Sequence, residues 1–223
     1  MARILRPLAL TVAAFAAGAF LNPFASDATA RPSSRPLQDV PLWMPTTTSV
    51  PNRHASESPS LRTEAGAVAA AAAFVCTGQQ LIDMSDGEVD AFLRRLVSSS
   101  VAEQIVAGHL RDLAALREVL APGTGPIVYR QGVLAHRVQA FDGDTARVSI
   151  WHVGVLARVD VAPPQAGWMV STVDLRWERG EWKVVDEIAL PGPAPILNDS
   201  VAPATADELL HDLDGFTDFG GSR

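Results

Sequence analysis

Three titratable side chains within predicted strands are the residues of this sequence best suited to acid–base chemistry: His152, Asp174 and Asp186. An aspartate that abstracts a proton needs a desolvated pocket, because burial keeps its pKa near the working pH. It also needs a hydrogen-bond donor opposite, to stabilise the oxyanion that forms. The single tyrosine, Tyr129, lies before the first predicted strand, so the sequence predicts no tyrosine donor. His152 and Asp174 remain as pocket candidates.

Each pocket candidate also has a structural interpretation. His152 shares one strand face with Val148 and Ile150, and this position makes it the better catalytic candidate. A histidine in such a place is more often half-buried and hydrogen-bonded to the backbone. Asp174 alternates with Arg176 along its strand, where a solvated aspartate paired with Arg176 or with a neighbouring strand is expected. The structural interpretations are favoured, so the sequence assigns no catalytic residue.

No cofactor site and no metal site are predicted. Neither a phosphate-binding glycine loop nor a G-x-S-x-G nucleophile elbow is present in the sequence. Cys76 is the only cysteine, and packing as a small apolar side chain is favoured over an intermolecular disulfide. The other histidines are scattered singly, without the spacing that a metal ion requires: His54, His109, His136 and His211.

The strands that would position these candidates are predicted at residues 133–141, 146–161, 168–177 and 182–190. Asp142 and Gly143 predict a tight hairpin turn, as do Arg179 and Gly180. Gly154 predicts a bulge or a sharp bend within the second strand. Residues 163–167 predict a wider connection. Trp177 and Trp182 flank the last turn, where we expect a cross-strand aromatic pair.

Three helices are predicted before the strands. The alanine-rich residues 63–84 contain no proline and predict the first helix. Ser85 and Glu88 form a capping-box pattern before the second helix, at residues 87–97. An apolar stripe over residues 101–120 predicts the third, which Pro122 and Gly123 end. Helices followed by a run of strands predict an α+β fold, with the helices packed on one face of a curved, antiparallel, four-stranded sheet.

Residues 1–30 have the form of an export signal. A basic start is followed by the mostly apolar residues 7–21, and residues 28–30 have the small-x-small form of a cleavage site. A membrane-spanning helix needs about 20 apolar residues, so cleavage is favoured over retention as an anchor. Either outcome predicts an extracytoplasmic protein, secreted or held at the membrane by this segment.

Residues 31–61 are rich in proline, serine and threonine and predict a disordered linker. The domain is expected at residues 62–195, followed by a tail at residues 196–223. Leu209, Leu213 and Phe216 predict a short acidic amphipathic helix in that tail, which either docks on the domain or meets a partner. The formal net charge of −7, without clusters of lysine and arginine, excludes nucleic acid as an expected partner.

The order of elements resembles the NTF2-like superfamily, whose members have a cone-shaped α+β fold. The segments VSIWHVG (148–154), APPQAGW (162–168), TVDLRW (172–177) and WKVV (182–185) resemble an actinobacterial exported family of unknown function, often met among conjugative-element genes. The resemblance covers about residues 63–195. It implies the fold of the extracytoplasmic domains of VirB8-like and TcpC-like conjugation-channel proteins, which assemble with other channel subunits. TcpC-like proteins carry a tandem second domain that this sequence lacks.

These observations predict an extracytoplasmic, non-enzymatic interaction domain, accessory to a conjugation or secretion apparatus, whose partners are envelope proteins or further copies of the chain. The alternative is a small-molecule binder, or an enzyme of the lyase or isomerase type, that uses the cone pocket. The resemblance to ketosteroid isomerase and scytalone dehydratase implies an Asp or His inside the cone for that second function. A pocket filled by Trp151, Trp168 or Trp177 would argue against it.

Overall fold

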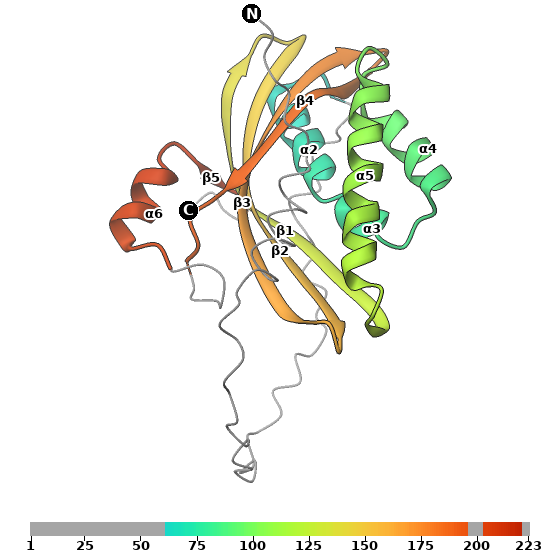
Figure 1. Cartoon of the computed structure of the whole chain (residues 1–223). Coiled ribbons are helices and arrows are strands. Elements are labelled where there is room, and N and C mark those ends of the chain that lie inside the picture. Colours follow the sequence, from blue (N-terminus) through green and yellow to red (C-terminus); the bar gives the residue numbers. More distant parts are fainter. Residues whose placement is uncertain (1–60, 196–202, 220–223) are drawn as a thin grey trace, which may run out of the picture.

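The computed structural model describes residues 61–195 and 203–219, and four helices precede the sheet in that part of the chain (Figure 1). They are α2 (Glu64–Val75), α3 (Gly78–Leu81), α4 (Asp86–Leu96) and α5 (Ala102–Leu120). The strands β1 (Thr124–Phe141), β2 (Thr145–Val159), β3 (Ala162–Glu178) and β4 (Glu181–Pro191) follow. The short helix α6 (Ala206–Asp212) and the two-residue strand β5 (Thr217–Asp218) end it. The predicted leader and residues 31–60 of the predicted linker lie outside the described residues.

The α+β class is confirmed, and the element count differs from the prediction. The sheet has five antiparallel strands in the order β4-β3-β2-β1-β5, because β5 adds to the free edge of β1. The predicted first helix divides into α2 and α3. The Thr77 hydroxyl donates back to the Phe74 carbonyl oxygen at 2.8 Å, and this bond favours a turn there. A Cβ on Gly78 would lie 2.8 Å from the Gln131 side chain, so glycine allows the close contact with β1.

The boundaries of the other helices follow their predicted signals. Ser85 and Glu88 form the predicted capping box, with the Ser85 amide donating to the Glu88 carboxylate at 2.8 Å. In α5, Arg117 donates to Asp86 at 2.9 Å and to the carbonyl oxygen of Leu81 at 3.3 Å. This one guanidinium therefore joins α5 to both the end of α3 and the start of α4.

Both predicted hairpin turns are present, with positive φ values at Gly143 and Gly180. Two boundaries were predicted wrongly. β1 begins at Thr124, which pairs with Val159, and an irregular step at Gly125 and Pro126 precedes the regular pairing with β2 that resumes at Val128. β3 begins at Ala162, so residues 163–167 are strand. Pairing with β4 begins at Met169, beyond these residues, and a strand segment of this kind at the edge of a sheet tolerates proline.

Irregular pairing gives the sheet its bends at places other than Gly154. That glycine pairs regularly with Gln131 on one side and Gly167 on the other. Extra residues occur instead in β1, between Val133 and Ala135 and again between Val138 and Ala140. Another occurs in β4 opposite the step from Asp174 to Leu175. Each extra residue increases the local twist and changes which side chains face the core.

The helices cover one face of the curved sheet, and the core lies between them (Figure 1). The side chains of Val148, Ile150 and Val173 are fully buried on this concave face. The predicted aromatic pair is confirmed: Trp177 and Trp182 are opposite one another, with ring centroids 5.4 Å apart and the rings nearly perpendicular. Apolar residues from α2, α4 and α5 complete the core: Ala67, Ala71, Phe74, Val89, Leu93, Leu113, Leu116 and Leu120.

The tail docks at the edge of β1. Thr217 and Asp218 pair with His136 and Ala135, and the Phe219 ring lies 4.8 Å from the His136 ring. α6 lies on the other side of the sheet from α4 and α5 (Figure 1). No residue of α6 itself is buried. The docking that the sequence left open is therefore made mainly by the residues after the helix.

Candidate functional site

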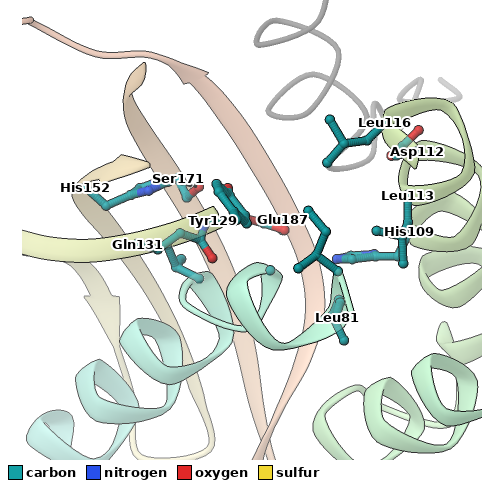
Figure 2. A pocket seen from close by; sticks show the side chains of 13 residues that line it. Leu81, His109, Asp112, Leu113, Leu116, Tyr129, Gln131, His152, Ser171 and Glu187 are labelled. Atoms are coloured by element: carbon teal, nitrogen blue, oxygen red, sulfur yellow. Dashed lines mark hydrogen bonds between the residues drawn. The ribbon is translucent and has the colours of Figure 1, made fainter. Parts of the chain in front are cut away.

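A cavity of about 40 Å³ lies between the concave face of the sheet and the helices α3 and α5 (Figure 2). A single water needs roughly 10–15 Å³ by this measure, so the cavity holds a ligand of only a few atoms. Its apolar lining residues are Val75, Gly78, Leu81, Ile82, Leu113 and Leu116. Its polar lining residues are His109, Asp112, Tyr129, Gln131, His152, Ser171 and Glu187.

Three of the polar lining residues lie on a diagonal across three strands of the sheet. His152 comes from β2, Ser171 from β3 and Glu187 from β4. Ser171 is opposite Ile150, two residues from His152, and Glu187 is opposite Val173, two residues from Ser171. Residues two apart on a strand share a face, so all three side chains face the helices.

The bulge in β4 determines which acidic residue enters the cavity. Val184 faces the core, and simple alternation would turn Asp186 inward after it. Because Leu175 pairs with Val184 while Asp174 pairs with Asp186, Val185 is an additional residue in β4. Glu187 therefore faces the cavity, and Asp186 lies opposite Asp174 on the convex face. Asp186, named with His152 and Asp174 as a candidate for acid–base chemistry, therefore lies outside the cavity.

His152 is buried on the predicted face, where it binds a side chain in place of the expected backbone group. Its Nε2 lies 3.0 Å from the Ser171 hydroxyl, and its Nδ1 has no partner among the described residues. Burial lowers the pKa of His152 to about 4, so the ring is neutral at physiological pH. A serine nucleophile needs a basic histidine that an acid orients through its second nitrogen, and that pattern is not met here.

Glu187 is the most perturbed group of the cavity. Its side chain is buried, and neither carboxylate oxygen makes a hydrogen bond of normal geometry within the described chain. Burial raises the pKa of Glu187 to about 8, while the nearby Ser171 hydroxyl opposes this rise and the charge of Asp186 adds to it. A carboxyl group with such a pKa exchanges its proton near neutral pH.

The α5 wall contributes two further polar groups. His109 is buried, and its Nδ1 lies 2.9 Å from the Ile105 carbonyl oxygen. A carbonyl only accepts, so Nδ1 carries the proton and Nε2 is left as an unpaired acceptor. Asp112 has one buried carboxylate oxygen without a partner, and burial raises its pKa. Figure 2 shows the His109 ring pointing from α5 toward the sheet.

Tyr129 corrects another expectation. It lies within β1 and lines the cavity, although the sequence placed it before the first strand. Burial, with the nearby charges of Cys76 and Glu187, raises the pKa of its hydroxyl, so this hydroxyl stays protonated at physiological pH. A tyrosine is therefore among the lining residues, contrary to the expectation from the sequence.

Asp174 takes no part in the cavity. It lies on the convex face and accepts two hydrogen bonds of 2.6 Å from Arg147 on β2. This ion pair with a neighbouring strand is the structural interpretation favoured above. No tryptophan lines the cavity among the described residues, so the filled pocket that would have argued against ligand binding is not observed there.

Residues 61–195 and 203–219 contain neither a cluster suited to a metal ion nor a helix suited to span a membrane. No group of three or more His, Cys, Asp or Glu side chains is placed to hold a metal ion there. No helix of that part of the chain has the length and apolar character that crossing a membrane requires.

No family model matches the sequence, and neither does any curated protein. Two solved structures are similar over part of the chain. The intermembrane space region of the chloroplast protein ARC6 is 12% identical with a TM-score of 0.32, over 46% of this chain and 78% of that chain. A type 2 hexachlorocyclohexane dehydrochlorinase, LinA, is 16% identical with a TM-score of 0.26, over 41% and 62%.

Proposed function

We propose that this protein binds a small molecule in the cavity between α5 and the concave face of the sheet. One observation carries the proposal: Glu187 is buried at the cavity wall, and neither carboxylate oxygen has a hydrogen bond of normal geometry, although the Ser171 hydroxyl lies close enough to lower the pKa of this carboxyl group. A buried polar group without a partner costs about 1–3 kcal/mol, and more when it is charged. A bound molecule that supplies the missing hydrogen bonds removes this cost, so binding is favoured at this place.

The proposal retains the expected location and changes the expected role. The leader at residues 1–30 supports an extracytoplasmic protein, secreted or anchored. We favour ligand binding over partner binding as the function, because the cavity is lined by buried polar groups that the packing of the core does not require. An enzyme of the lyase or isomerase type would use the same walls, with Glu187 as the proton-transferring carboxyl group. Turnover of a bound ligand distinguishes that function from binding.

Filling the cavity is expected to abolish ligand binding. Leu116 lines the α5 wall and is buried, so Leu116→Phe places additional carbon atoms in the cavity. In a fragment screen followed by amide NMR shifts, we expect hits whose shifts map to the lining residues. Leu116→Phe should weaken these hits at least tenfold.

Val159→Phe is the matched control, because Val159 is 59% exposed and lies outside the cavity. It should bind the same fragments as the wild type. Shifts at the lining residues that persist unchanged in Leu116→Phe would contradict the proposal, and so would a screen in which no fragment moves them.

A second candidate function rests on the convex face, which α2 to α5 leave uncovered (Figure 1). Ile188 and Leu190 are 44% and 54% exposed there, beside Val170 on the adjacent strand. The Trp151 and Trp168 rings pack together on the same face, 5.5 Å apart. Together these five residues form an apolar patch of the kind that meets a protein partner. The patch supports docking of a protein partner, for which the expectation from the sequence is an envelope protein of a conjugation or secretion apparatus.

The double variant Ile188→Asp/Leu190→Asp tests this docking. The amount of envelope proteins that copurify should be at least tenfold lower for the double variant than for the wild-type full chain. Arg147→Gln, which changes the polar end of the same face, should retain them. Recovery of channel components by the double variant would exclude the patch. Loss of a wild-type dimer in the variant would identify self-association as its role.

A further inference from the structure

We propose that the ligand is a small primary ammonium compound, held by the unpaired acceptors that surround the cavity. The inference rests on the proposed function and specifies its chemical class. It follows from what the walls of the cavity offer a ligand and from what they lack.

The unpaired polar atoms of the cavity are acceptors once the carboxyl groups of Glu187 and Asp112 are ionised. Glu187 contributes two carboxylate oxygens and Asp112 one, and His109 contributes Nε2. The His109 proton is committed to the Ile105 carbonyl oxygen through Nδ1, so Nε2 has only a lone pair to offer. The fifth unpaired atom, Nδ1 of His152, is an acceptor when Nε2 holds the proton toward Ser171. A complementary ligand must donate hydrogen bonds.

The cavity also lacks a positive charge. Its described lining residues include two carboxylic acids and neither lysine nor arginine. Buried carboxylates are normally paired with a cation, since an isolated buried charge is costly. A primary ammonium group supplies one positive charge and three N–H donors in a small volume. It therefore supplies both the missing hydrogen-bond donors and the missing positive charge, whereas a neutral amide or an alcohol supplies only the donors.

The size of the cavity limits the compound. About 40 Å³ accommodates an ammonium group with a short alkyl chain, and the leucine side chains of α3 and α5 provide the apolar contact. Ethylammonium is a suitable probe. A ligand of three non-hydrogen atoms binds with a dissociation constant on the order of millimolar or weaker, which NMR titration measures.

Binding of a cation is expected to release a proton from Glu187. The ionisable groups that face Glu187 are Tyr129 from β1, His152 from β2 and His109 and Asp112 from α5. On its own strand, Asp186 lies on the opposite face. Burial lowers the pKa of both histidines, so neither adds a positive charge near neutral pH. Glu187, with a pKa of about 8, is the group that changes charge there.

The sign of the pH dependence follows from this charge. Below pH 8 Glu187 is mostly protonated and must lose its proton to pair with the cation. The affinity for ethylammonium should therefore rise about tenfold per pH unit from pH 6 to 7.5, and level off above pH 8. The ligand remains a cation throughout this range, so the rise reports on the protein.

The experiment is an amide and histidine NMR titration of the full chain with ethylammonium chloride, at constant ionic strength against sodium chloride. Acetamide and acetate are titrated as a neutral and an anionic probe of similar size. We expect shifts at His109 and Glu187 with ethylammonium, and at least tenfold weaker effects with the other two probes. Amine buffers are omitted, because they would compete.

Glu187→Gln keeps the size and the polarity of the side chain and removes its charge. It should weaken ethylammonium binding at least tenfold at pH 8 and make the affinity independent of pH. Glu181→Gln removes an exposed carboxylate of the same strand and should leave binding unchanged. Rescue by Glu187→Asp, in part, is expected from a charge that acts directly on the ligand.

The outcomes separate the two proposals. Fragments that bind the cavity while ethylammonium does not, or equal binding of acetamide, overturn the ammonium proposal and leave ligand binding standing. A pH-independent affinity for ethylammonium also overturns it. If neither ethylammonium nor any screened fragment moves the lining residues, both proposals fail.

Discussion

Replacing Glu187 by glutamine is expected to abolish a loss of stability that the wild-type protein shows between pH 6.5 and 8.5. The pKa of Glu187 is about 8 in the folded protein and 4.5 in a solvated chain. The folded state therefore holds a proton that the unfolded state has lost, so stability falls as pH rises from 4.5 through 8. Glu187 is 6% exposed, so solvent screens this effect little.

The effect of the histidines on stability has the opposite pH dependence. It therefore limits the pH range in which the effect of Glu187 can be measured alone. The pKa of His152 is about 4 in the fold against 6.5 in a solvated chain, so its contribution increases stability from pH 4 to 6.5. The effects of His152 and Glu187 oppose one another up to pH 6.5, and only that of Glu187 continues above it. Between pH 6.5 and 8.5 it amounts to about 2 kcal/mol, or roughly 4–8 °C in Tm.

Thermal unfolding at closely spaced pH values measures this difference. In phosphate and borate buffers the wild-type Tm should fall across the window, while Glu187→Gln should keep a constant Tm. Glu181→Gln, an exposed carboxylate on the same strand, should follow the wild type. A parallel decline in wild type and Glu187→Gln would mean that Glu187 is ionised, or is paired, throughout.

Leu93→Ala is expected to give the largest loss of stability of any single change considered. α4 is held to the domain by two buried residues, Val89 and Leu93, both fully buried. Truncation of a buried leucine costs about 2–5 kcal/mol, from the lost transfer energy and from the cavity left behind. Arg117 also contacts α4, and Phe92 of α4 packs against the core, but neither fills the space that the Leu93 side chain leaves, so we expect about 3 kcal/mol.

Urea unfolding followed by tryptophan fluorescence provides the measurement. Leu96→Ala is the control, because Leu96 is on the same helix and only partly buried. It should cost about 1 kcal/mol, since less apolar area returns to water. Equal losses for the two variants would show that α4 packs differently. Neither leucine lines the cavity, so both variants should retain ligand binding.

Much of the fold could be predicted from local signals. The capping box at Ser85, the apolar stripe of α5 and the turns at Gly143 and Gly180 are each encoded within a few residues, and all were confirmed. The early start of β1 could not be predicted this way, because Gly125 and Pro126 have low β-propensity and the strand starts where Thr124 pairs with the distant Val159. The separate helix α3 was missed as well, since Gly78 is needed for contact with a strand more than 50 residues later.

The candidate site was predicted less completely. The alternation around Ile150 predicted the inward position of His152, which was confirmed, and Ser171 had the same signal through Val173 and Leu175. Glu187 had none. A two-residue period turns Asp186 inward, and the bulge at Val185 reverses that choice. His109 and Asp112 lie on a helix whose sequence does not indicate which strand they will face.

The amino-acid sequence alone determined the order of helices and strands and the α+β class, because periodicity, caps and turns depend on neighbouring residues. The tertiary structure decided which polar side chains share a cavity. One additional residue in β4 exchanged Asp186 for Glu187, and the packing of α5 brought His109 opposite. Burial of Glu187 at that place, away from any cation of the cavity wall, raises its pKa, and only the assembled layers produce that burial.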